Sequence, residues 1–210
     1  MEGIKNLVID FGGVIINLTR NRCIEAFESL GVANIREQIV NNYQHNDLFM
    51  KIELGSITVA EFREGIRHLT RQPLTDEQID AAWIAMLDDV PDYKLDLLLD
   101  LRKRYNTMLL SNTNEIHWDW SEKTCFSYKG HHASDFFNHI YLSYRLHLLK
   151  PDAEIFEYVL QDADIRPEET LFIDDAVPNC RTAESLGFHT YTPQPREDWS
   201  HLFGIMNHKS

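Results

Sequence analysis

Three short apolar runs constrain the fold most, because a polar residue follows each of them directly. They occupy residues 4–9, 107–110 and 170–173. Nearly continuous apolar runs of this length, rich in β-branched residues, are typical of strands buried on both faces of a parallel sheet. The residues that follow are Asp10, Ser111 and the pair Asp174-Asp175. Since ligands of such sheets bind at the carboxyl ends of the strands, we expect these side chains to share one crevice.

Helical patterns alternate with the strands. Helices are expected at residues 95–101, 153–161 and 179–187, and two shorter strands at residues 140–143 and 189–191. Strands that alternate with helices predict an α/β fold, and specifically a Rossmann-like, doubly wound parallel sheet.

The stretch over residues 18–90 has a different character. It carries amphipathic helical patterns, such as the stripe formed by Phe62, Ile66 and Leu69, and it contains no convincing strand. Thr75 followed by Asp-Glu-Gln is typical of a capping box, which begins a further helix. We therefore expect an inserted α-helical cap in this stretch.

This change of character predicts the domain organisation. Residues 1–17 and 91–210 are expected to form the Rossmann-like core, and residues 18–90 the helical cap. The cap interrupts the chain between the first strand and its successor, a place from which it could roof the crevice at the strand ends.

Composition and charge limit the classes of partner. The chain of 210 residues is 43% hydrophobic and 25% charged, as in ordinary globular proteins. No stretch approaches the roughly 18 apolar residues of a membrane helix, and the N-terminus does not resemble a signal peptide. The formal net charge of −13 disfavours a nucleic acid partner. An acidic protein that handles an anionic substrate has to neutralise it locally, by a metal ion, a lysine or a helix N-terminus.

The cysteines indicate the compartment. Cys23, Cys125 and Cys180 are widely separated and odd in number, which argues against a disulfide framework and against a zinc site of paired thiolates. A reducing cytoplasm fits this pattern best. The sequence leaves open whether the protein is a monomer or a homodimer.

The polar residues at the strand ends form a chemically coherent set. Together with Lys150, the residues Asp10, Ser111 and Asp174-Asp175 would supply a nucleophile, a hydrogen-bond donor, a cation and a metal site. A carboxylate that attacks a phosphate dianion faces a repulsion of about 4 kcal/mol per pair of unit charges at about 4 Å and an effective dielectric near 20. Both Lys150 and Mg²⁺ can cancel this repulsion. Magnesium prefers hard oxygen ligands, which Asp10 and Asp175 offer.

Four motifs in fixed order resemble those of the haloacid dehalogenase superfamily. They are Asp10-Phe-Gly-Gly-Val, Leu-Leu-Ser111-Asn112-Thr-Asn, Lys150-Pro151-Asp152 and Phe-Ile-Asp174-Asp175. Within the superfamily, Ser-Asn-Thr-Asn followed by His117 is similar to bacterial sugar-phosphate phosphatases of the glucose-1-phosphate phosphatase type. The resemblance implies a magnesium-dependent phosphatase that acts on a small phosphorylated metabolite, with a sugar phosphate as the expected substrate.

The resemblance also implies catalytic roles. Asp10 would be the nucleophile and would form an aspartyl-phosphate. Ser111 and the neighbouring amide of Asn112 would bind the phosphoryl oxygens, and Lys150 would contact both the nucleophile and the phosphate. These four residues are the predicted catalytic and phosphate-binding groups.

The metal ligands are implied in the same way. Asp10, Asp175 and the backbone carbonyl of Gly12 would bind Mg²⁺ directly, and Asp174 would act through a water or through its neighbours.

Gly12 is also the one departure from the superfamily pattern. Most phosphatases of the superfamily carry there a second Asp, which protonates the leaving oxygen. Such acid–base catalysis typically contributes roughly 10²–10⁴-fold in rate. The sugar-phosphate subgroup shares the glycine. An anomeric phosphate, whose alcohol is relatively acidic, would need this help less.

Four residues of the predicted cap are candidates for contacts with the rest of the substrate: Arg20, Arg22, Tyr43 and Asn46. Arg20 is the strongest candidate because it lies just beyond the first motif. Asn179, in a predicted helix after the acidic pair, is expected to pack or to cap rather than to bind a ligand.

Two other functions remain open. A catalytically weak or non-hydrolytic relative could use the same core for binding or regulation, but the presence of Asp10 and Lys150 argues against it. A 2-haloacid dehalogenase would work without metal. The acidic pair Asp174-Asp175 disfavours this reading, because uncompensated carboxylates would repel the carboxylate of the substrate.

Overall fold

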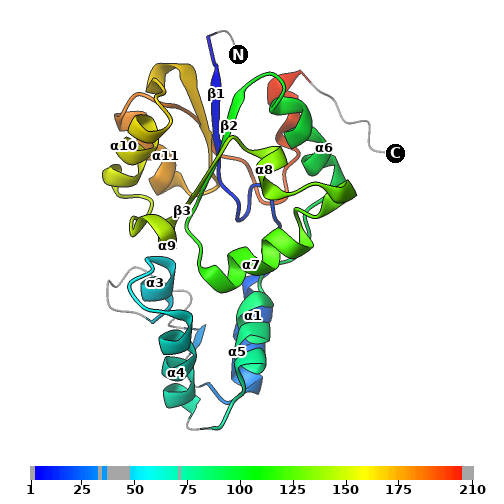
Figure 1. Ribbon diagram of the computed structural model, residues 1–210, viewed down its shortest axis with the longest axis vertical. Coiled ribbons are helices and arrows are strands. Elements are labelled where there is room, and N and C mark those ends of the chain that lie inside the picture. The colour runs from blue at the N-terminus through cyan, green and yellow to red at the C-terminus, as the bar shows by residue number, and fades with distance from the viewer. Residues whose placement is uncertain (1–2, 33–34, 37–47, 71, 205–210) are drawn as a thin grey trace.

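The computed structural model describes residues 3–32, 35–36, 48–70 and 72–204. Its centre is a five-stranded sheet, parallel throughout, in the order β3-β2-β1-β4-β5 (Figure 1). The strands are β1 (Asn6–Ile9), β2 (Asn106–Ser111), β3 (His139–Leu142), β4 (Thr170–Ile173) and β5 (His189–Tyr191). Every predicted strand is present, with ends shifted by at most two residues.

Helices cover both faces of the sheet and also lie beside the carboxyl ends of its strands (Figure 1). They are α6 (Asp92–Leu101), α7 (Glu115–Thr124), α8 (Ala133–Phe136), α9 (Ser143–Leu146), α10 (Ala153–Asp162) and α11 (Val177–Ser185), with the short 3₁₀ helices η1 (Tyr128–Gly130), η2 (Pro167–Glu169) and η3 (Trp199–Phe203). Helices α6 and α8 lie on one side of the sheet and α10 and α11 on the other (Figure 1). The prediction of a doubly wound α/β sheet is confirmed.

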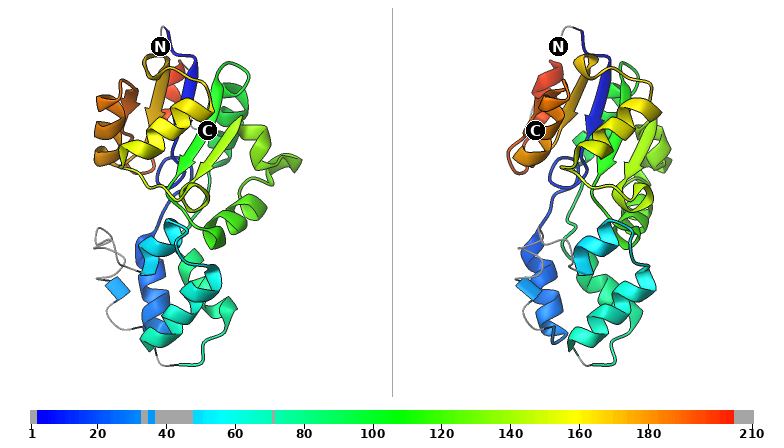
Figure 2. Two further views of the ribbon diagram at one scale, coloured as in Figure 1. Left: turned by 60° about the vertical axis from the view of Figure 1, so that its left-hand side comes forward. Right: turned by 90° about the vertical axis from the view of Figure 1, so that its left-hand side faces the viewer.

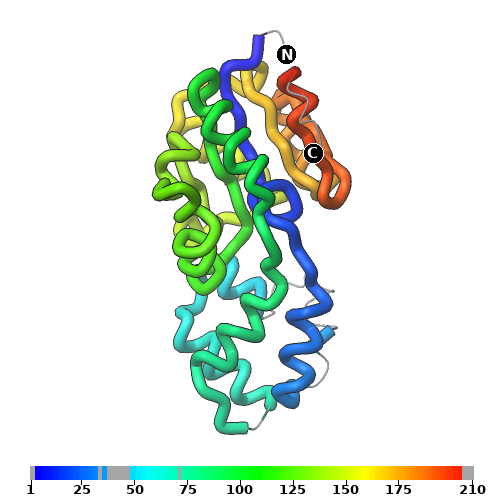
Figure 3. The backbone as a smooth tube through the Cα atoms, turned by 90° about the vertical axis from the view of Figure 1, so that its right-hand side faces the viewer, coloured from blue at the N-terminus to red at the C-terminus, as the bar shows by residue number. Residues whose placement is uncertain are grey.

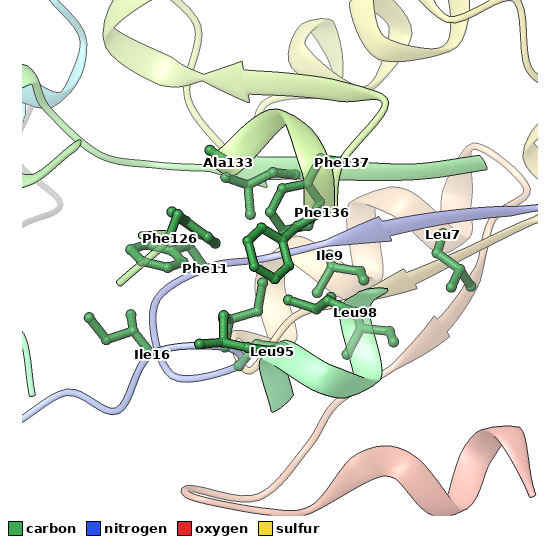
Figure 4. Packing of buried hydrophobic residues seen from close by; sticks show 14 of the residues in the cluster. Leu7, Ile9, Phe11, Ile16, Leu95, Leu98, Phe126, Ala133, Phe136 and Phe137 are labelled. Atoms are coloured by element: carbon green, nitrogen blue, oxygen red, sulfur yellow. The ribbon is translucent and has the colours of Figure 1, made fainter. Parts of the chain in front are cut away.

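Alternate residues of β1 face the two helical layers. Leu7 and Ile9 belong to the cluster that includes Leu95 and Leu98 of α6, whereas Val8 packs with Phe156 and its neighbours from α10 and α11. Figure 4 shows the first of these layers, with the residues of α6 against the strand and the turn that follows it. Burial on both faces explains why the strands are nearly continuous apolar runs.

Further helices lie beyond the carboxyl ends of the strands (Figures 1 and 2), and those with described bounds form what we call the helical cluster. They are α1 (Arg20–Ser29), α3 (Leu48–Glu53), α4 (Val59–Thr70) and α5 (Asp76–Ile84). They have a core of their own in which Phe27, Phe49 and Phe62 surround Trp83, with 4.9 Å between the ring centroids of Phe49 and Trp83. The predicted capping box at Thr75 is present, since its side chain accepts from the amide of Gln78.

Two details of the helical predictions were wrong. Leu69 was expected to continue the buried stripe of Phe62 and Ile66, but it is 40% exposed in the last turn of α4, at the far end of the helical cluster. Gly187 lies beyond α11, which ends at Ser185; its φ of +95° is a left-handed conformation that stops the helix.

Two paired connections join the helical cluster to the sheet. The amide of Asn17 donates to the carbonyl of Asp89, and the amide of Asp88 donates back to Asn17. The amide of Thr19 donates to the carbonyl of Met86. Residues 17–19 and 86–89 thus form a paired ribbon. Figure 3 shows both connections running side by side between the two parts of the molecule. The chain therefore enters and leaves the helical cluster at one place.

Among the described residues, no helix is both long and apolar enough to cross a membrane.

Candidate active site

The polar residues predicted at the strand ends meet at one edge of the sheet. Asp10 directly follows β1, Ser111 is the last residue of β2, and Asp174 directly follows β4. Because β1 lies between β2 and β4, with Ile9 opposite both Leu109 and Ile173, the three side chains come from adjacent strands. The parallel register thus gathers residues that are far apart in the chain, with Asp10 more than 100 positions from both Ser111 and Asp174.

Lys150, in the segment before α10, extends its side chain between Asp10 and Asp174. Its Nζ donates to Oδ1 of Asp10 at 2.8 Å, to Oδ2 of Asp174 at 2.6 Å and to the carbonyl of Leu110 at 2.8 Å. The side chain is 1% exposed, so its three N–H groups are matched by three acceptors away from water.

Asn112 fixes the backbone of Lys150. Its side-chain amide donates to the carbonyl of Lys150 at 2.8 Å, and its Oδ1 accepts from the amide of Lys150 at 2.9 Å. The side chain of Asn112 is thereby engaged, which leaves its backbone amide as the group that could bind phosphate.

Asp174 is fully buried and held from several directions. Besides Lys150, the amide of Ala176 donates to Oδ1 at 2.8 Å, and Nδ2 of Asn179 donates to both carboxylate oxygens at 3.0 and 3.1 Å. Asn179, which was expected to pack or to cap rather than to bind a ligand, thus holds this carboxylate in place. Its place one turn into α11 aims its amide back at the strand end. The acidic pair followed by a polar residue in the first turn of the next helix was the available signal.

The carboxylates form a group that fits a divalent cation. Ligand oxygens of Asp10, Asp174 and Asp175 all lie within 4.8 Å of one another. Magnesium favours such hard oxygen donors. Gly13, with φ of +82°, lets the backbone approach closely, since a Cβ there would collide with the carboxylate of Asp175. The turn after β1 is thus shaped around this carboxylate.

Burial sets the charge states in the site. It raises the pKa of Asp10 to about 7, against the lowering effect of Lys150 and with a further increase from Asp174. Burial alone would lower the pKa of Lys150, but Asp10 and Asp174 outweigh it and raise that pKa above its usual value. Lys150 therefore stays protonated, and a cation beside Asp10 would favour its ionised form.

Asp175 is exposed but lies in the same crevice. Partial loss of hydration and the neighbouring Asp174 raise its pKa, whereas Arg20 and Lys150 oppose this increase. Arg20 is thus near enough to act on the carboxylate electrostatically from the beginning of α1.

The crevice is a cavity of about 700 Å³ between the sheet edge and the helical cluster. All the predicted site residues line it: Asp10, Gly12, Arg20, Ser111, Asn112, Lys150, Asp174 and Asp175. The hydroxyl of Ser111 donates to the carbonyl of Asn112 at 3.4 Å, a weak bond that a ligand could replace.

The helical cluster supplies the opposite wall. It includes polar side chains of α3, namely Lys51 and Glu53, and the apolar Met50, Trp83 and Met86. None of these was singled out from the sequence, because only the packing of α3 and α5 brings them to the cavity.

His117 also lines the cavity but is not available as an acid at neutral pH. Its ring stacks on Trp83, with 4.5 Å between centroids, and its Nε2 lies 3.0 Å from the carbonyl of Trp83. Burial lowers the pKa of His117 to about 4. A neutral ring that donates from Nε2 fits this arrangement.

Arg22, a further cap candidate, is not among the residues that line the cavity. Arg22 forms an ion pair with Asp88 at 3.0 Å, beside the two connections. Tyr43 and Asn46 lie outside the described residues.

The sequence matches the family model of haloacid dehalogenase-like hydrolases over residues 4–187. The chain belongs to this family. The predicted family, like the predicted fold class, is confirmed.

Several proteins of known name or structure are similar to this chain over nearly its whole length. It is 38% identical to D-ribitol-5-phosphate phosphatase of Bacteroides thetaiotaomicron, over 93% of this chain and 95% of the relative. A haloacid dehalogenase-family enzyme of the same bacterium, crystallised with magnesium and inorganic phosphate, shares 53% identity with a TM-score of 0.91 over 95% of this chain and 99% of its own. A haloacid dehalogenase-like hydrolase of Porphyromonas gingivalis shares 37% identity with a TM-score of 0.89, over 96% of each chain.

These relatives agree with the predicted activity class and cofactor, since one is a phosphatase and another binds magnesium and phosphate. The L-2-haloacid dehalogenase of Xanthobacter autotrophicus, at 17% identity and a TM-score of 0.59, shares the fold alone.

Proposed function

We propose that this hydrolase is a magnesium-dependent phosphatase of a small phosphorylated sugar or sugar alcohol, with Asp10 as its nucleophile. One observation carries the proposal: the carboxylate of Asp10 contacts the ammonium of Lys150 and shares with Asp174 and Asp175 a cluster no wider than 4.8 Å. A nucleophile, a cation and a set of metal ligands are therefore within reach of one phosphoryl group.

The reaction would take two steps. A carboxylate oxygen of Asp10 attacks phosphorus, the bond from phosphorus to the substrate oxygen breaks, and an aspartyl-phosphate forms. A water molecule then attacks this phosphorus, which releases inorganic phosphate and restores the carboxylate of Asp10. In both steps negative charge is spread over the phosphoryl oxygens, and groups positioned beforehand stabilise it.

Three residues of the chain would stabilise that charge. Lys150 lies against the nucleophile and stays protonated, so it can neutralise a phosphoryl oxygen beside Asp10. Ser111 and the backbone amide of Asn112 can donate hydrogen bonds to the other oxygens, from the end of β2. Asn112 also holds Lys150 in place through two hydrogen bonds between its side chain and the backbone of Lys150.

Magnesium would be held by Asp10, Asp175 and the carbonyl of Gly12. Bound there, it would supply positive charge against the phosphoryl oxygens. Asp174 has its oxygens engaged by Lys150, Asn179 and a backbone amide, so we assign it to positioning or to a water-mediated contact. Exposed Asp175 is the better direct ligand.

Most phosphatases of the superfamily have an Asp at the position of Gly12, and this Asp protonates the oxygen of the leaving group. This chain lacks that acid. The relative named for D-ribitol 5-phosphate acts on a primary phosphate ester, whose alcohol is a poor leaving group. We therefore propose that a primary ester is the substrate here too, and that the second wall of the cavity compensates through binding. This departs from the anomeric phosphate expected from the glycine alone.

We propose that residues 18–90 act as the cap that selects the substrate. Arg20, Lys51 and Glu53 would contact its hydroxyl-bearing part, because they line the cavity opposite the nucleophile.

The three described cysteines are free and buried, in keeping with a cytoplasmic protein.

The decisive experiment measures phosphate release from purified protein with Mg²⁺. D-ribitol 5-phosphate, primary-ester sugar phosphates and an anomeric sugar phosphate should be compared. We expect Asp10→Asn to lose activity by about 10⁴-fold or more, as removal of a nucleophile does. Asp164→Asn is the matched control, because Asp164 is exposed at the end of α10 with φ of +49°, a conformation that Asn tolerates.

Equal hydrolysis by wild type and Asp10→Asn would overturn the assignment of the nucleophile. Activity on a 2-haloacid that survives chelation of metal would instead favour the dehalogenase. A lack of turnover, combined with thermal stabilisation by Mg²⁺ and phosphate, would favour a binding protein.

A further inference from the structure

A buried lysine outside the proposed site contacts the turn that follows the nucleophile. Lys94 of α6 is 1% exposed, and its Nζ donates to the carbonyl oxygen of Val14 at 2.6 Å. Nε1 of Trp199, in η3, donates to the same oxygen at 3.1 Å. Two donors from elements far apart in the chain therefore hold a single carbonyl group.

An ammonium group in this place is costly. Burial lowers the pKa of Lys94 to about 8, against the opposing effect of Asp198, Asp89 and Glu197. A methionine would fill a similar space without the loss of hydration that a charged group suffers. The ammonium therefore contributes something that apolar packing of α6 against the sheet does not require.

The carbonyl that it holds belongs to a tight turn. The carbonyl of Phe11 accepts from the amides of Ile15 and Ile16, and the amide of Gly13 donates to the carbonyl of Ile16. These bonds tie residues 11–16 together, so the turn moves as one unit. Figure 4 shows Leu95, the neighbour of Lys94, beside Ile16 at this turn.

The same turn contains one of the proposed metal ligands and lies against the other two. It begins directly after Asp10, contains Gly12, and presses Gly13 against the carboxylate of Asp175 with no room for a Cβ. A shift of the turn by a fraction of an ångström would therefore change the spacing between Asp10 and Asp175. Ligand geometry of this kind controls the affinity for Mg²⁺, which demands near-ideal octahedral coordination.

We infer that Lys94 and Trp199 are positioning residues for magnesium: by anchoring the carbonyl of Val14, they fix the turn that sets Asp10 and Gly12 against Asp175. Neither side chain lines the cavity. The inference rests on the proposed metal ligands and adds the groups that hold them in register.

The test uses Lys94→Met, which removes the ammonium but keeps the length of the side chain, and Trp199→Phe, which removes the indole N–H but keeps a ring. Mg²⁺ binding is measured by calorimetry without substrate. Loss of residues that orient metal ligands typically lowers affinity 10–100-fold, and these two act through one further residue. We expect the Kd for Mg²⁺ to rise by about tenfold in each variant.

Val159→Ala is the control, because it removes buried apolar volume from the opposite face of the sheet. It should lower the melting temperature and leave the Kd for Mg²⁺ unchanged. An unchanged Kd in both Lys94→Met and Trp199→Phe would overturn the inference. An equal rise in Val159→Ala would do the same, because it would show that general destabilisation is the cause.

Asp175→Asn separates this inference from the proposed function. If Asp175→Asn binds Mg²⁺ like wild type, the proposed ligand set is wrong and the inference falls with it. If Asp175→Asn loses binding while Lys94→Met and Trp199→Phe retain it, the ligand set stands and only the anchoring role is refuted.

Discussion

The two walls of the cavity are built in opposite ways. On the sheet side, Lys150 and Asp174 are buried and matched by hydrogen bonds on every side. On the helical side, Lys51 and Glu53 of α3 are partly exposed and extend from a small bundle that has its own aromatic core. The difference teaches that the proposed chemistry depends on fixed strand ends, whereas the proposed selection depends on how α3 is placed over them.

The largest expected effect tests the sheet wall. Lys150→Met removes the cation that lies between Asp10 and Asp174. We expect phosphatase activity to fall by about 10³-fold, comparable to the loss of a group that stabilises transition-state charge. We also expect a loss of about 3–5 kcal/mol in the free energy of unfolding at neutral pH, because the buried carboxylates of Asp10 and Asp174 lose the cation that pairs with both. Kinetics and denaturant unfolding measure the two losses.

Lys129→Met is a suitable control, since Lys129 forms an exposed pair with Asp96. If Lys150→Met were as active as this control, the proposed role of the sheet wall in catalysis would be refuted.

The second effect concerns the contact between the walls. Burial holds the pKa of His117 at about 4, below the ordinary value of 6.5, so the folded state resists its protonation. The stability that comes from keeping His117 neutral is complete above pH 6.5 and is lost as the pH falls toward 4. Two and a half pH units correspond to about 3 kcal/mol. Unfolding free energies measured from pH 7 to pH 4 should decline less steeply in His117→Phe than in wild type.

Val159→Ala, which removes no titratable group, should keep the pH dependence of wild type. The same slope in His117→Phe as in wild type would show that burial against Trp83 does not lower the pKa of His117.

The smallest effect tests the helical wall. Lys51→Met should raise the KM for the natural substrate by about tenfold, the equivalent of one lost polar contact, and leave kcat nearly unchanged. Hydrolysis of p-nitrophenyl phosphate, which lacks the hydroxyl-bearing part, should stay at the level of wild type. Lys103→Met at the end of α6 serves as the control. A fall in kcat with both substrates would contradict the division of labour between the walls.

The sequence predicted the sheet wall far better than the helical wall, for a physical reason. Asp10, Ser111 and Asp174 directly follow or end apolar strands, and parallel pairing brings such ends together whatever the connecting segments do. The placement of Lys150 followed from its motif rather than from any periodicity. Each of these residues has a local signal.

The residues that were missed have a weak local signal or none. Lys51 reaches the cavity because of the angle at which α3 packs. Lys94 is buried although it is charged, because it lies next to the apolar stripe of α6. Asn179 looked like a packing residue because its helix carries small residues at regular spacing. For Leu69 the error was the opposite, because a residue predicted to be buried is exposed. Periodicity does not show where a helix extends past its neighbours.

The paired ribbon of residues 17–19 and 86–89 has a consequence for how such a chain can change. Because its two strands are already joined by backbone hydrogen bonds, the distance that an inserted segment must span is fixed and short. Segments of very different length can close the same gap at little difference in entropy, since the cost grows only with the logarithm of loop length. A different helical insert could therefore be exchanged at this junction, giving the enzyme a new selectivity while the strand ends keep their spacing.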